Sequence, residues 1–187
     1  MALTAVFEEL CVKLRGLQDA MRDLAVSAAE DKPLRGDVLL ADRFSDVAED
    51  LSGWLEETLN AARSAHQAVI HPTDLETARQ CLVTCQEKFN VFSRRFASDL
   101  SRYEQIAELM RLGQVRKGEW QAWAKIVRSN VERCQQPLHE VTLAIFHCWQ
   151  EVAEQAGKAL VSVRTTNIGQ QIKSSLPDMY DLPAGGA

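Results

Sequence analysis

Apolar residues recur along the first part of the chain at alternating steps of three and four, the spacing of one face of a long helix. The first series comprises Leu3, Phe7, Leu10, Leu14, Leu17, Met21, Leu24 and Ala28. Pro33 and Gly36 then interrupt the pattern, and Asp37 can cap the next helix. The second series comprises Leu40, Phe44, Val47, Leu51, Trp54, Thr58, Ala62, Ala65 and Val69. The pattern predicts one helix that ends near Ala28 and a second that ends near Ile70.

Two further helices are predicted after His71-Pro72, a dipeptide that ends a helix. Thr73 and Glu76 have capping-box spacing, so we expect the Thr73 side chain to accept a hydrogen bond from the third helical N–H group. The third series comprises Leu75, Ala78, Leu82, Cys85, Phe89, Phe92, Phe96, Asp99, Tyr103, Ile106 and Met110. The fourth comprises Trp120, Trp123, Val127, Val131, Cys134, Leu138, Val141, Ile145, Cys148 and Val152, and predicts a helix to about Leu160.

Two positions depart from the apolar pattern. Asp99 has two possible explanations. It is a buried acid that pairs with an arginine and sets the register of the helices, or the apolar series shifts by one position so that Leu100 faces inward. We expect this shift. Pro137 lies inside the fourth helix, where it removes one backbone hydrogen bond and predicts a kink or a short break.

The four helices predict an all-α fold. At 1.5 Å per residue they are about 40 to 65 Å long, which suits antiparallel neighbours joined by short loops. We therefore predict an up-down antiparallel four-helix bundle over residues 1–160. Residues 161–187 are predicted to be a C-terminal extended tail that is flexible or serves as a docking segment. No strand pattern precedes Val161, which excludes the α/β enzyme folds.

Composition is that of a soluble globular domain, with 46% hydrophobic and 25% charged residues. The amino-terminal residues lack the basic segment of a signal peptide, and no apolar run reaches the ~20 residues that span a bilayer. We therefore expect a cytoplasmic protein. Its five cysteines are then expected to be reduced thiols, because disulfides are rare in that compartment.

The distribution of charge along the chain is uneven. Residues 1–87 carry 8 basic and 16 acidic residues, whereas residues 88–133 carry 10 basic and 5 acidic ones. Solvated helix faces are one explanation. The other is an acidic half that meets the basic region of a neighbouring copy or a protein partner. The net charge of -5 gives no overall basic field, so no nucleic-acid partner is expected.

The sequence lacks the patterns of nucleotide-binding and acyl-transfer enzymes, namely the phosphate-binding glycine loop, the dinucleotide fingerprint and the nucleophile elbow. No histidine follows a glutamate at three residues, as the di-iron sites of helical bundles require. Cys81 and Cys85 lie one helical turn apart and could bind zinc together with Cys134, His139, His147 or Cys148. Because most of these cysteines fall on the apolar series, we expect buried thiols, no metal, no cofactor and no enzymatic activity.

Aromatic and basic side chains gather at the start of the fourth helix. The candidate basic patch comprises Arg116, Lys117, Trp120, Lys125 and Arg128. Such a patch can bind single-stranded nucleic acid or an anionic bilayer surface. Trp120 and Trp123 fall on the apolar series, however, so we expect them to lie in the core with the basic residues flanking them.

The residues that follow the fourth helix differ in character. Val161-Ser-Val163 alternates apolar and polar residues, and Thr165-Thr166 is β-branched, which favours extended backbone. The next six residues, Asn167 to Ile172, resemble the core of the RIP homotypic interaction motifs and of related fungal and bacterial amyloid signalling motifs, and depart from it at Gln170 and Lys173. The candidate interaction residues of this resemblance are Val163, Asn167, Ile168, Gly169, Gln171 and Ile172.

Three functions remain open at this point. We expect a non-enzymatic bundle that acts by protein–protein association, as an adaptor, a scaffold or a regulated assembly module. In bacteria the motifs just named can follow a small helical Bell domain, so the resemblance implies an alternative, a cell-death or defence effector that assembles through an amyloid-like tail and acts on membranes. A metal-binding bundle is the third.

Two alternatives to the amyloid-like interpretation of the tail are also open. The tail is either an ordinary polar segment, which Pro177 and Pro183 favour, or a docking peptide over residues 176–182.

Overall fold

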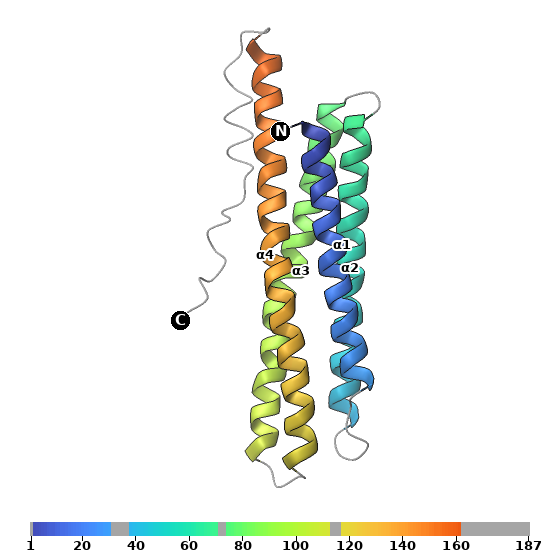
Figure 1. Ribbon diagram of the computed structural model, residues 1–187, viewed down its shortest axis with the longest axis vertical. Coiled ribbons are helices and arrows are strands. Elements are labelled where there is room, and N and C mark those ends of the chain that lie inside the picture. The colour runs from blue at the N-terminus through green and yellow to red at the C-terminus, as the bar shows by residue number, and fades with distance from the viewer. Residues whose placement is uncertain (1, 31–37, 71–73, 113–116, 162–187) are drawn as a thin grey trace.

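The computed structural model describes residues 2–30, 38–70, 74–112 and 117–161, with only the backbone described for residues 28–30, 38–43, 45, 100–112, 117–124 and 159–161. It contains α1 (Leu3–Glu30), α2 (Val38–Ile70), α3 (Leu75–Leu112) and α4 (Lys117–Val161) (Figure 1). Among the described residues only Ala2 and Asp74 lie outside these helices. The prediction of an all-α fold is therefore confirmed.

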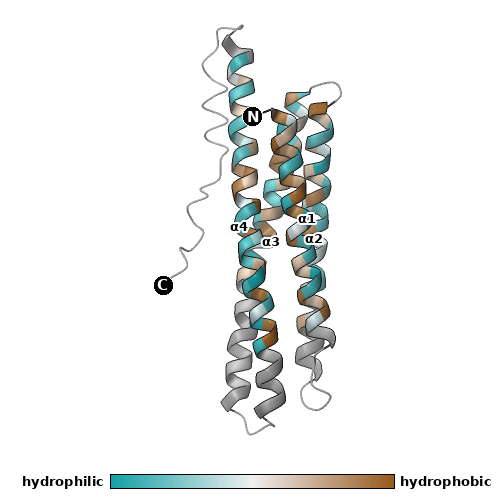
Figure 2. Cartoon of the chain, viewed as in Figure 1, coloured by the Kyte–Doolittle hydropathy of each residue, from teal (hydrophilic) through white to brown (hydrophobic). Residues whose placement is uncertain are grey.

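The four helices pack around one continuous core and form a four-helix bundle (Figure 1). α1 contacts α2 and α4, and α3 contacts the same two helices, so each helix has two neighbours in the bundle. Figure 2 shows apolar and polar residues alternating around each helix where side chains are described. No described helix carries an apolar stretch of the length and hydropathy that crossing a bilayer requires.

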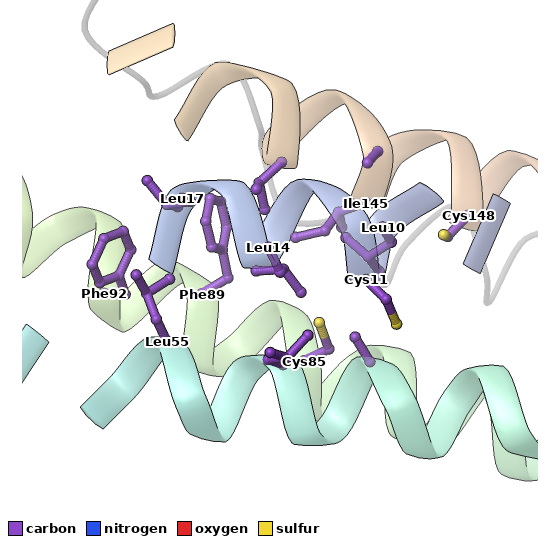
Figure 3. Packing of buried hydrophobic residues seen from close by; sticks show 14 of the residues in the cluster. Leu10, Cys11, Leu14, Leu17, Leu55, Cys85, Phe89, Phe92, Ile145 and Cys148 are labelled. Carbon is purple, nitrogen blue, oxygen red and sulfur yellow. The ribbon is translucent and has the colours of Figure 1, made fainter. Parts of the chain in front are cut away.

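The predicted apolar series supply most of the core. All seven described members of the first series are buried, from Leu3 to Leu24. Figure 3 shows Leu14 and Leu17 of α1, Leu55 of α2 and Phe92 of α3, which all belong to this one buried cluster. The structure also buries apolar residues that the series omitted, namely Val6, Cys11, Ala48, Leu55, Leu59, Ala144 and Trp149. These residues are buried because a bundle helix that touches two neighbours covers a wider stripe than two positions per heptad.

The amino-terminal cap of α3 is Asp74 and not the predicted Thr73, which lies outside the described residues. Thr77 donates its backbone N–H to Asp74 Oδ1 at 2.9 Å and its hydroxyl to Asp74 Oδ2 at 2.6 Å. These two hydrogen bonds, the hydroxyl first, lower the pKa of Asp74 because they stabilise its charged form. The capping prediction was wrong by one residue, since both Thr73 and Asp74 are good cap residues and the sequence alone did not separate them.

The two positions that departed from the apolar pattern have local explanations. Asp99 forms an ion pair with Arg95 one turn earlier at 3.4 Å, and its side chain is 21% exposed. Leu100, which a drift of the series would turn inward, lies outside the described side chains. Pro137 lies inside α4, which continues through it as one helix, so the predicted break is absent. Cys134 and Val141 are buried on either side of Pro137, and this packing holds both halves of α4 against the same core.

Candidate functional site

The candidate interaction residues of the tail lie outside the part of the chain that the structure describes. They are Val163, Asn167, Ile168, Gly169, Gln171 and Ile172. The resemblance to amyloid signalling motifs therefore stays a prediction.

The candidate basic patch is described only in part. Arg116 lies outside the described residues, and Lys117 and Trp120 belong to the stretch of α4 for which only the backbone is described. Lys125 and Arg128 are exposed on the next turns of α4. The described end of the patch is thus a solvent-facing basic segment.

One side of the bundle, formed by α1 and α2, carries a concentration of exposed acids. This acidic side comprises Asp19 and Asp23 on α1 and Asp46, Glu49 and Asp50 on α2. Arg22 lies among them and contacts Asp19 at 3.5 Å. Among the described side chains of residues 19–23 and 46–50, one basic residue stands against five acids, which gives this part of the side a negative charge.

The opposite side, formed by α3 and α4, carries the complementary charge. This basic side comprises Arg94 and Arg95 on α3 and Lys125, Arg128 and Arg133 on α4, of which Arg95 is half-buried and the others exposed. Among the described side chains of these stretches, the acids are Glu132 and Asp99, which pairs with Arg95. Figure 1 shows α1 beside α2 and α3 beside α4 at the lower half of the bundle, where all four segments lie. Folding therefore converts a segregation along the chain into two opposed charged sides.

Polar side chains also join neighbouring helices near the middle of the bundle. Lys13 on α1 donates to Glu140 Oε2 on α4 at 2.8 Å. This hydrogen bond from Lys13, together with one from Gln136, lowers the pKa of Glu140. Lys88 on α3 pairs with Glu57 on α2. Sequence reasoning missed these pairs because each joins residues distant in the chain.

A buried hydrogen bond links α3 to α4 within the core. Trp149 Nε1 donates to Gln86 Oε1 at 2.7 Å, and the two residues are 2% and 4% exposed. Each satisfies a polar group of the other that burial would otherwise leave without a partner. In the sequence, Gln86 follows a member of the third apolar series and Trp149 follows a member of the fourth. These positions are too weak a signal to predict the pair.

Four of the five cysteines are buried core side chains, and Cys81 is half-buried against the core. Burial raises the pKa of Cys85 and of Cys134 to about 12, because a thiolate would lose its hydration there. The Cys148 thiol, also buried, donates to the backbone carbonyl of Val6 at 3.4 Å. Zinc binds the thiolate form. Across the described residues, no group of three or more His, Cys, Asp or Glu side chains could hold a metal ion.

The helices and their shared core define the class of this protein, an all-α four-helix bundle. Comparisons with protein-family models, curated proteins and solved structures gave no match.

Proposed function

We propose that this protein is an up-down antiparallel four-helix bundle that acts by protein–protein association, as an adaptor, a scaffold or a regulated assembly module. Contacts between helices support the antiparallel order. Val6 contacts Cys148 and Lys13 contacts Glu140, so residue numbers rise along α1 as they fall along α4. On α1 and α2, Gln18 donates a hydrogen bond to Glu56, and Arg15 lines one pocket with Arg63 and His66. Residue numbers therefore fall along α1 as they rise along α2.

The single observation that carries the association is the pair of opposed charged sides. An acidic side on α1–α2 and a basic side on α3–α4 are mutually complementary, so one copy can present its acidic side to the basic side of the next. Charge complementarity between exposed groups is screened over about 8 Å at physiological ionic strength. The proposed partner is therefore a second copy, held by contacts that salt weakens.

Sedimentation of the full chain at low and high salt tests this proposal. We expect a larger mass at low salt that falls to the monomer at high salt. Two double variants should each reduce association. Asp46→Lys/Asp50→Lys adds basic residues to the acidic side, and Arg94→Glu/Lys125→Glu adds acidic residues to the basic side, so each weakens the attraction between the two sides. Glu154→Lys, an exposed change near the other end of α4, is the matched control.

The mixture of the two charge-reversed variants gives the sharper result. The first variant keeps its basic side intact and the second keeps its acidic side intact, so the two should associate with each other when neither does alone. A monomer at both ionic strengths, or a mixture that stays monomeric, contradicts the proposal.

A further inference from the structure

A pocket of about 300 Å³ opens between α1 and α2, on residues that the proposed association does not use. Its volume lies at the lower end of the range for small-molecule sites and is about ten times that of one water molecule. Its lining comprises Glu8, Cys11, Val12, Arg15, Arg63, His66 and Gln67.

One residue of the pocket lining has a buried nitrogen without a partner among the described residues. His66 Nε2 is buried and makes no hydrogen bond with the described residues. Buried polar atoms in native proteins nearly always have a partner, which can come from the protein, from water or from a bound molecule. His66 also lines the pocket, so a rotation of its imidazole ring would bring this buried nitrogen to a molecule bound there.

The remaining lining is rich in hydrogen-bond donors. Arg15 has no ion-pair partner among the described residues, and Arg63 contacts Glu56 only at 4.0 Å while donating to Asn60 at 3.2 Å. Gln67 adds an exposed amide. Glu8 is the one acid of the lining. Two guanidinium groups against one carboxylate favour an anion.

The floor of the pocket is apolar and neutral. Figure 3 shows the Cys11 side chain directed from α1 toward α2, and the residue is buried. Burial is the largest influence on its thiol and raises the pKa of Cys11, against the lowering effect of Arg15 and Arg63. The thiol is therefore protonated at neutral pH and adds no negative charge. Val12 is 55% exposed and offers an apolar contact beside the pocket.

We propose that this pocket binds a small phosphate-bearing molecule through Arg15, Arg63 and His66. The donors come from both helices, and a phosphate group presents three free oxygens to them, one more than a carboxylate. Once the imidazole ring turns toward the pocket, a phosphate oxygen accepts a hydrogen bond from His66 Nε2 and so satisfies this nitrogen. This inference goes beyond the proposed function, since its residues are separate from both charged sides.

Titration of the full chain with inorganic phosphate, at ionic strength held constant with chloride, tests the site. Phosphate should shift the imidazole nitrogen resonances of His66 saturably, with His66→Gln identifying the signal. Arg15→Gln and Arg63→Gln should each weaken binding about tenfold, the loss expected for one charge-assisted hydrogen bond. Arg22→Gln, an exposed arginine of α1 outside the pocket, is the matched control and should leave the affinity unchanged.

Three results would overturn the inference. One is the absence of a saturable shift, and another is an unchanged affinity in the Arg15→Gln/Arg63→Gln double variant. The third is acetate binding as tightly as phosphate, which would remove the preference for three acceptor oxygens. Failure here is distinguishable from failure of the association, because sedimentation of the same samples measures the latter separately.

Discussion

At the scale of single residues, the hydrogen bond between Gln86 and Trp149 is the contact whose removal is most informative. Gln86→Leu leaves the Trp149 N–H buried without an acceptor, which should cost about 1 to 3 kcal/mol in the free energy of unfolding. Trp149→Phe leaves the Gln86 amide oxygen without its donor. The double variant removes both polar groups, so we expect it to lose less stability than the sum of the single variants.

Chemical denaturation of the wild type, the two single variants and the double variant gives the coupling free energy of this pair. A coupling indistinguishable from zero would mean that the two side chains do not depend on each other in solution. The distance of 2.7 Å and the burial of both residues argue for a clearly measurable coupling.

At the scale of an element, the start of α3 should confer a pH-dependent part of the stability. The pKa of Asp74 is lowered from 3.8 in the folded chain, so its ionised form is preferred on folding. The resulting stabilisation is complete above the unfolded pKa and is lost as the pH falls through the lower, folded value. Asp74→Asn keeps a capping oxygen without an ionisable group, so its stability deficit relative to wild type should shrink below about pH 4.

Denaturant midpoints of wild type and Asp74→Asn, followed from pH 7 to acid, measure that deficit. Glu87→Gln, an exposed substitution further along α3, should show no comparable trend. A deficit for Asp74→Asn that stays constant across this range would contradict the role of the charged cap.

At the scale of the whole molecule, one core joins all four helices, so the bundle should unfold as a unit. Leu14→Ala on α1 and Phe92→Ala on α3 remove fully buried side chains and should each cost about 2 to 5 kcal/mol in the free energy of unfolding. Val26→Ala, at a residue 46% exposed, should change it by less than about 0.5 kcal/mol. Denaturation followed by circular dichroism and by tryptophan fluorescence should give coincident transitions for each variant.

Two separate transitions, or a loss below about 0.5 kcal/mol in both core variants, would show that α1 and α3 do not share one core. The same experiment bears on the proposed association. Measured at several protein concentrations in low salt, the midpoint should rise with concentration if folded copies bind one another.

The spacing of apolar residues was enough to predict the four helices, close to their observed ends, and most of the residues in the core. Leu10, Leu14 and Phe92 fell on the predicted apolar faces and are buried. The helical period alone determines which residues share a face, and it does not depend on which helix packs against that face. The same reasoning missed Leu55, Leu59 and Ala144, whose burial depends on the second neighbour that each bundle helix has.

Features that depend on which helices are neighbours were decided only by the tertiary structure. The pair of Gln86 and Trp149 joins residues 63 apart in the chain, and the pocket that includes Arg15 and His66 exists only because α1 lies beside α2. The uneven distribution of charge along the sequence was likewise compatible with two explanations, namely solvated helix faces or an interaction surface. Packing α1 beside α2 and α3 beside α4 brought the acids to one side and the bases to the other, because side chains far apart in the chain become neighbours only through packing.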